Sequence, residues 1–305
     1  MLFSDAMKEF LYDCECRHLT KGTIRNYRAS LSFLNTYLAT KGKSEIEEIT
    51  AKDIRDFMRA KQADGRKPAY INDLLKAYKV MFSYLEEENY ISDNIMKKVR
   101  NVHQPKIIIE TFNEEEIKKL LKYYTGNDFL SIRNKTIIAL LFDTGMRCNE
   151  MILMKQEDIA ENYILVKHGK GNKERVVPKS PYLSRQLMKY IRVRQGYFAN
   201  KKTRCENLFL SKTGKPLTGE AVARMLKQAA KEVGVSDAVR VSPHTCRHTF
   251  AQIQLKNGLD LYSLSRIMGH TNISITQRYL QGLKDKEIVR RGEMNSPLMN
   301  LEKYF

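Results

Sequence analysis

The sequence predicts a mainly α-helical protein of two domains, with one small antiparallel β-sheet in the second. The chain has 305 residues, which is longer than a single domain usually is. Hydrophobic residues make up 42% of it, enough to form two hydrophobic cores. Apolar residues recur at spacings of three and four along most of the chain, as they do on the buried face of a helix. Over residues 162–178 this period gives way to β-rich segments, which predict the sheet.

The first domain, residues 1–102, is predicted to be a bundle of four helices. Thr50 followed by Asp53 resembles a capping box, and Pro68 suits the first turn of the last helix. A helix is also expected to open near Thr23. The apolar positions that define the four helices are Phe3, Met7, Phe10 and Cys14; Ile24, Tyr27, Leu31, Leu34 and Leu38; Ile54, Phe57 and Met58; and Ile71, Leu74, Tyr78, Met81 and Leu85.

Residues 103–112 are predicted to link the two domains. Pro105 breaks the helical period, and Asn113, followed by three glutamates, marks the start of the next helix. The second domain then covers residues 113–305. Residues 1–105 contain 18 basic and 15 acidic side chains and the rest of the chain contains 35 and 20, so the second domain holds most of the positive charge.

The second domain is predicted to be helical around one β-hairpin. A strongly apolar helix runs from Ile132 to Phe142, and Gly145 supplies a stop. The segments 162–168 and 174–178 flank a glycine-rich, basic tip and form the hairpin. Further helices are predicted at 181–197, 218–233, 243–256 and 260–268, with a last one spanning Tyr279.

The net charge of +18 indicates a polyanionic partner, because each Lys or Arg that reaches a phosphate releases condensed counterions. Nucleic acid is the first candidate. An anionic membrane surface competes, but no apolar run approaches the length of a spanning helix and the N-terminus lacks a secretory charge pattern. Five cysteines without a CxxC pair predict reduced thiols. We therefore expect a soluble, cytoplasmic protein.

The stretch from Ser242 to His248 is the most informative for chemistry. Ser242 as N-cap and Pro243 at the first helical position mark a helix start, so His244 and Arg247 share a face there. Free backbone N–H groups at a helix N-terminus favour a phosphate. An isolated His-x-x-Arg is nevertheless more often a capping and packing pair.

A zinc site is the competing interpretation of this stretch, with His244, Cys246, His248 and His270 as ligands. It is disfavoured, because Thr245 stands where a metalloprotease carries its general-base Glu, and Cys246 projects off the face of the two histidines. We expect no metal and no other cofactor. His248 and Cys246 are interpreted as structural.

Other candidate residues are ambiguous one by one. Arg147 is one of 53 basic residues and is placed to pair with Glu150 three positions on. Tyr279 is one of 16 tyrosines and suits a packed helix position. Lys170 and Lys173 suit an exposed turn.

Taken together, these motifs resemble the tyrosine recombinase family, which includes phage and transposon integrases and Xer resolvases. The resemblance is clearest over about residues 110–285, and the first domain is similar to the family's SAM-like core-binding domain. The matching motifs, in order, are Thr144-Gly145-Met146-Arg147, Gly169-Lys170-Gly171-Asn172-Lys173-Glu174-Arg175, His244-x-x-Arg247-His248, Met268-Gly269-His270 and Tyr279. Gln281 departs mildly from the family, which often has His there.

The resemblance implies a metal- and ATP-independent DNA strand transferase. Tyr279 would attack the scissile phosphorus to give a 3′-phosphotyrosine, with His244 as its base, since a free tyrosine titrates near pH ~10. Arg147 and Arg247 would clamp the non-bridging oxygens, and His270 would hydrogen-bond the phosphate.

The resemblance also implies a role for the hairpin and for the tail. Lys170 would protonate the departing 5′ oxygen, with Lys173 as the alternative general acid. If Lys170 is the acid, Lys173 and Arg175 would contact the DNA backbone as point charges. The apolar C-terminal tail would dock on a neighbouring subunit or fold back on its own domain.

The implied assembly is a clamp on double-stranded DNA, with four protomers joining two recombination sites through a Holliday junction. The sequence does not decide whether a paired recombinase or an accessory protein takes part. It also does not decide between chromosome-dimer resolution and the integration or excision of a mobile element. The expected context is the nucleoid of a bacterium, or a phage or mobile element. Three rivals are a DNA-binding regulator that does not cut, a type IB topoisomerase and a metal-dependent nuclease. The intact set of six reacting groups favours the recombinase over the regulator.

Overall fold

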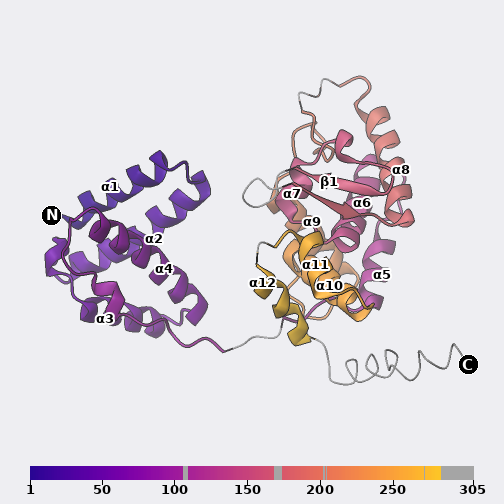
Figure 1. The fold of residues 1–305 in the computed structure, drawn as a ribbon. Helices are drawn as coiled ribbons and strands as arrows, with labels where there is room; N and C mark the ends of the chain where they lie inside the picture. Colours follow the sequence, from indigo (N-terminus) through magenta and orange to yellow (C-terminus); the bar gives the residue numbers. More distant parts are fainter. Residues whose placement is uncertain (106–108, 168–173, 202, 204, 271, 283–305) are drawn as a thin grey trace, which may run out of the picture. The chain divides into compact units, whose positions relative to one another are not determined.

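The computed structural model forms two compact units, Met1–Lys106 and Ile107–Phe305 (Figure 1). It describes residues 1–105, 109–167, 174–201, 203, 205–270 and 272–282, with only the backbone at 281 and 282. The fold class is confirmed, because the described chain is mostly helical with one two-stranded antiparallel sheet. In this described part, no helix is long and apolar enough to cross a membrane.

The first unit is the predicted four-helix bundle. Thr50 and Asp53 form the expected capping box, and Pro68 opens the last helix. The second helix begins two residues earlier than expected, because the Thr20 side chain caps it by accepting from the Thr23 N–H. The helices are α1 (Phe3–Cys16), α2 (Lys21–Thr40), α3 (Ala51–Ala63) and α4 (Pro68–Glu87), with 3-10 turns η1 (Ile46–Glu48) and η2 (Ile95–Lys98).

The chain leaves this unit through a defined contact with α4. The Asn72 side chain donates to the Val102 carbonyl at 2.9 Å and accepts from the Val102 N–H at 2.8 Å. After residues 106–108, the Phe112 N–H donates to the Thr249 hydroxyl at 3.2 Å and the Thr111 hydroxyl donates to Gln252. Both ends of the connection are thus fixed to helices by side-chain hydrogen bonds.

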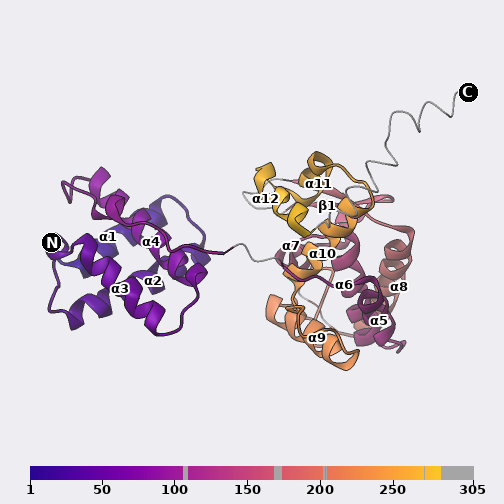
Figure 2. The same ribbon diagram turned by 90° about the horizontal axis from the view of Figure 1, so that it is seen from below.

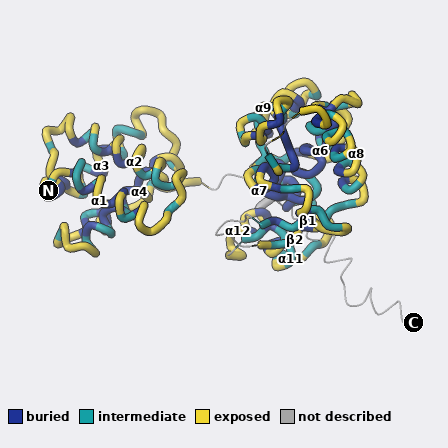
Figure 3. The backbone as a smooth tube through the Cα atoms, turned by 90° about the horizontal axis from the view of Figure 1, so that it is seen from above, coloured by how far each residue is buried: buried dark blue, intermediate teal, exposed yellow. Residues whose placement is uncertain are grey.

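The second unit surrounds α6, whose residues are buried on nearly every side (Figures 2 and 3). Its elements are α5 (Glu114–Tyr123), α6 (Phe129–Thr144), α7 (Cys148–Leu153), η3 (Gln156–Asp158), β1 (Tyr163–Val166), β2 (Arg175–Pro178), α8 (Pro181–Phe198), α9 (Gly219–Glu232), α10 (Pro243–Lys256), α11 (Leu261–Met268), α12 (Ile273–Gln277) and η4 (Arg278–Gly282). Strands β1 and β2 pair with Tyr163 opposite Pro178. The hairpin tip that was predicted between them lies outside the described residues.

The helix ends of the second unit follow the sequence signals. Asn113 caps α5, Ser242 caps α10 with Pro243 in its first turn, and Gly145 ends α6 in the left-handed region. The helix expected around Tyr279 is present as two consecutive segments of different type. α12 ends at Gln277 and the chain tightens into the 3-10 turn η4, which carries Tyr279.

Candidate active site

The candidate residues come together where four segments meet: the end of α6, the start of α7, helix α10 and the segment after α11. Gly145 makes this convergence possible, because its φ of 59° is left-handed and an added Cβ would lie 2.2 Å from the Phe250 ring of α10. The chain then turns directly into Arg147, the N-cap of α7. Only glycine fits where α6 and α10 approach so closely.

Arg247 is buried at the centre of the cluster, with 2% of its surface exposed. Its guanidinium donates to the Gly145 carbonyl at 2.7 Å and to the Met268 carbonyl at 2.6 Å. Its Nη2 also lies 3.0 Å from His270 Nε2. Burial, together with the positive charge of Arg147, lowers the pKa of Arg247 to about 10, so it stays charged at neutral pH. A buried cation held by neutral carbonyls favours an incoming anion.

Arg147 lies beside this centre and is more accessible, with 31% of its side chain exposed. Its Nη1 donates to Glu150 Oε1 at 2.9 Å, and its Nη2 lies 3.5 Å from the Gly269 carbonyl. Its backbone N–H donates to the other Glu150 oxygen at 2.7 Å. Glu150 therefore fixes both the backbone and the side chain of Arg147.

Glu150 is the acidic hub of the site, with 2% of its side chain exposed. It accepts two further hydrogen bonds from Arg175, at 2.9 and 2.7 Å, in a bidentate pair. Burial alone would raise the pKa of Glu150, but the bonds from Arg175 and Arg147 outweigh it and lower the pKa. Sequence reasoning gave Glu150 only as an ion-pair partner of Arg147, and its i+3 spacing was the available signal.

Arg175 differs from its expected place. Its side chain is 9% exposed, and its three nitrogens are engaged by Glu150 and by the Ile267 carbonyl, the latter at 2.7 Å. It also packs where a Cβ on Gly269 would lie, 2.8 Å from its Cδ. This geometry makes Arg175 an internal brace between β2, α7 and the end of α11, instead of the exposed DNA-backbone contact that the sequence suggested.

His270 has a defined tautomer. Arginine can only donate, so His270 Nε2 accepts from Arg247 and the ring proton lies on Nδ1. That Nδ1 lies 2.8 Å from the buried Thr276 hydroxyl and donates to it. Burial, reinforced by Arg247 and Arg147, lowers the pKa of His270 to about 4, which keeps the ring neutral at neutral pH. Thr276 was not among the predicted site residues.

Tyr279 packs against the same cluster with 4% of its surface exposed. Its ring stacks with His270 at a centroid distance of 6.1 Å and meets His248 at 4.9 Å. Burial raises the pKa of Tyr279, while the charge of Arg247 and a hydrogen bond to it act in the opposite direction. The phenol is therefore protonated at neutral pH and needs a proton acceptor to become a nucleophile.

His244 lies at the exposed start of α10 and pairs with His248, one turn on, with their Nε2 atoms 3.0 Å apart. Burial, reinforced by Arg247, Arg147 and Arg240, lowers the pKa of His244. The structure thus brings together five of the six predicted catalytic residues: Arg147, His244, Arg247, His270 and Tyr279. Lys170 and Lys173 lie outside the described residues.

Among the residues that the structure describes, no three His, Cys, Asp or Glu side chains are placed to share a metal ion. Cys246, a candidate zinc ligand, is buried with 0% exposure. What the cluster offers is two guanidinium groups, neutral imidazoles and a buried phenol. That set suits phosphoryl chemistry on a tyrosine.

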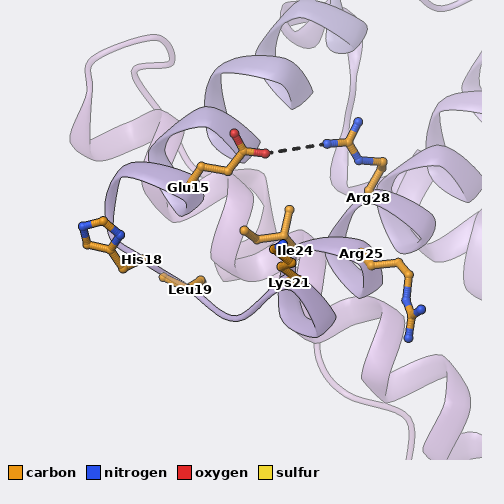
Figure 4. Close-up of a pocket in the computed structure, with 7 residues that line it drawn as sticks. All are labelled: Glu15, His18, Leu19, Lys21, Ile24, Arg25 and Arg28. Carbon is orange, nitrogen blue, oxygen red and sulfur yellow. Dashed lines mark ion pairs between the residues drawn. The ribbon is translucent and has the colours of Figure 1, made fainter. Parts of the chain in front are cut away.

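The first unit has its own basic feature, a surface pocket of about 550 Å³ between the end of α1 and the start of α2 (Figure 4). Lys21 and Arg25 are exposed there, and Arg28 reaches Glu15 across the pocket at 4.0 Å. Figure 4 shows Arg25 directed away from that ion pair. The N-terminal end of α2 adds partial positive charge to this surface.

Comparison with known proteins identifies the family. Residues 110–286 match the phage integrase family, and residues 8–89 match the phage integrase N-terminal SAM-like domain. The chain belongs to the phage integrase family of tyrosine recombinases. The family match spans all five clustered residues.

Relatives of this family cover nearly the whole chain. The tyrosine recombinase XerD of Listeria monocytogenes is 29% identical over 279 residues, which are 90% of this chain and 93% of that protein. XerH bound to a palindromic difH substrate in a post-cleavage complex is 23% identical with a TM-score of 0.75, covering 93% of this chain and 82% of that one. A lambda integrase tetramer on a Holliday junction is 17% identical with a TM-score of 0.72, covering 93% of this chain and 79% of that one.

Proposed function

We propose that this integrase-family chain is a site-specific DNA recombinase that cleaves and rejoins strands through a 3′-phosphotyrosine on Tyr279. The observation that carries the proposal is the packing of buried Tyr279 beside Arg247 and His270, with Arg147 at the edge of the same cluster. A phosphate that enters there meets fixed cations next to a tyrosine. Fixed cations stabilise the charge that builds up in the transition state without reorganisation.

Each residue has a distinct role in this proposal. Arg147 and Arg247 bind the non-bridging oxygens, and Glu150 with Arg175 keeps Arg147 in place. His244 takes the proton of the Tyr279 hydroxyl as the oxygen–phosphorus bond forms. Lys170 gives a proton to the departing 5′ oxygen, with Lys173 as the alternative acid.

His270 changes its partner during this reaction. In the structure its Nε2 accepts from Arg247, so it can donate to a phosphate from that nitrogen only when it is protonated there. The negative charge of a bound phosphate raises the pKa of a neighbouring imidazole and favours that form. We propose that phosphate entry protonates His270 and frees the Arg247 guanidinium to turn its donors to the DNA.

DNA binding is proposed to use both units. The +18 net charge favours double-stranded DNA as the partner, and Lys21 and Arg25 offer exposed charges for backbone phosphates. The lambda integrase tetramer on a Holliday junction supports a synaptic tetramer for this chain also. A bacterial or mobile-element protein that acts on DNA works in the cytoplasm, which is the location that we propose.

The recombinase is distinguished from its rivals in two steps. The protein is first incubated, in EDTA, with a pool of random-sequence duplexes that each carry a nick, and covalently bound DNA is sequenced. Two copies of the selected site are then placed on one plasmid. We expect excision or inversion between the copies; relaxation of supercoils without exchange would indicate a topoisomerase, and sequence-specific binding without any adduct would indicate a regulator.

A further inference from the structure

His248 contacts both the proposed base and the proposed nucleophile, although the proposed mechanism gives it no part. Its Nε2 is 3.0 Å from the Nε2 of His244, one turn earlier on α10. The two rings meet edge to face, with centroids 4.5 Å apart and an interplanar angle of 89°. On its other side, the His248 ring meets the Tyr279 ring at 4.9 Å and 67°.

The hydrogen bond between the two histidines restricts where their protons lie. Two imidazole nitrogens at this distance share one proton, so one of them donates and the other accepts. Burial, reinforced by His244 and Arg247, lowers the pKa of His248 to about 4, so this ring is neutral at neutral pH. The groups that face the pair are Arg247 on α10, Tyr279 on η4, Arg147 at the start of α7 and Arg240 before α10.

We propose that His248 is a positioning residue that accepts the Nε2 proton of His244 and so leaves the Nδ1 of His244 free to take the proton of Tyr279. The inference rests on the proposed function. The phenol proton moves to His244 Nδ1 as the Tyr279 oxygen bonds to phosphorus, the bond from phosphorus to the 5′ oxygen breaks, and that oxygen takes its proton from the general acid. His244 then carries an imidazolium whose Nε2–H still points at His248.

A neutral orienting group suits this site. Active sites commonly use a third side chain to hold a catalytic histidine in one tautomer, and a carboxylate is the usual choice. A carboxylate next to His244 would repel the scissile phosphate, whereas a neutral imidazole fixes the tautomer without adding negative charge. The T-shaped contact with Tyr279 also keeps the phenol ring against the same helix.

The proposal is tested with His248→Gln and His248→Phe, using a nicked duplex selected by covalent capture and the rate of adduct formation across acidic to basic pH. Gln retains a hydrogen-bond acceptor and Phe retains only the ring, so we expect Phe to slow cleavage by about 10- to 100-fold and Gln to restore most of the rate. Loss of the acceptor destabilises the His244 imidazolium. The acidic limb of the rate profile should therefore move to lower pH in the Phe variant.

DNA affinity and melting temperature should remain near those of the wild-type protein, and His103→Gln, at an exposed histidine, serves as the matched control. If the Phe and Gln variants slow adduct formation equally and the acidic limb of the rate–pH profile does not move, His248 is a packing residue and the proposal is overturned. Imidazole ¹⁵N NMR of the free protein tests the two tautomers independently of activity. The proposal requires an unprotonated Nε2 on His248 and a protonated Nε2 on His244. If the wild-type protein forms no adduct, the proposed function fails, while the tautomer measurement still decides the role of His248.

Discussion

Glu150→Gln should destabilise the second unit strongly while keeping the shape of the side chain. The carboxylate is 2% exposed and accepts bonds from two guanidinium groups and one backbone N–H, all at 2.7–2.9 Å. In Gln, one oxygen becomes an NH₂ that points at arginine donors. Removing one partner of a buried ion pair costs about 3–5 kcal/mol, because the remaining charge is left uncompensated.

Thermal and urea unfolding measure this effect. In a domain of this size, 1 kcal/mol shifts the melting temperature by about 2–4 °C, so the expected drop is roughly 6–20 °C. Glu206→Gln is the matched control, because Glu206 also forms an ion pair, with Lys155, but is 80% exposed. We expect no measurable change there. A Glu150→Gln protein as stable as the control would refute the view of Glu150 as the hub of the site.

Comparing the wild-type protein with Glu150→Gln also predicts how the stability of the second unit depends on pH. The pKa of Glu150 is lower in the folded protein than its ordinary value of 4.5, so its contribution is fully present above that value. The contribution is lost as the pH falls through the lower, folded-state pKa. The wild-type protein should therefore lose its stability advantage over Glu150→Gln in acid, and an advantage that persists there would contradict the assignment.

Three further predictions follow from the geometry. Gly145→Ala combines left-handed backbone strain with a Cβ 2.2 Å from the Phe250 ring, so it should lower the free energy of unfolding by about 2–5 kcal/mol. Gly196→Ala is the control, because Gly196 is a helical glycine with open space around it. Urea unfolding should show the control to be neutral or slightly stabilising. Arg247→Lys keeps the charge but loses the fork that holds two carbonyls, so adduct formation should fall by about 100-fold or more while DNA affinity changes little; an unchanged rate would exclude Arg247 from the reaction. DNA affinity should fall steeply with added salt, and a flat response in a titration series would argue against phosphate contacts.

Local sequence signals predicted the elements well, because most helix ends in this chain are encoded within four residues. The side chains of Thr50, Asn113 and Ser242 each accept a hydrogen bond from the backbone N–H three residues further on. The change of helix type just before Tyr279 was not predicted. Thr276 and Tyr279 are both buried against the rest of the unit, and this tertiary packing accompanies the change to a 3-10 turn, which propensity cannot indicate.

The site was predictable as a set of residues but not as a network. Motif order identified Arg147, Arg247 and Tyr279, whereas the partners of each charge depend on contacts between distant segments. Arg175 was expected to face DNA because it follows a basic hairpin tip, yet its pairing with Glu150, 25 positions away, turns it inward. The contact between His248 and Tyr279 likewise depends on how α10 packs against η4.

The most direct test of the central claim is to identify the residue that carries the DNA. Wild-type protein trapped on a nicked duplex in EDTA is digested, and the nucleotide-bearing peptide is sequenced by mass spectrometry, alongside Tyr279→Phe and the control Tyr262→Phe at a tyrosine that is 65% exposed. We predict a nucleotide on Tyr279 in the wild-type and Tyr262→Phe proteins and no adduct from Tyr279→Phe. An adduct of undiminished yield from Tyr279→Phe, or a nucleotide on any other residue, would contradict the mechanism.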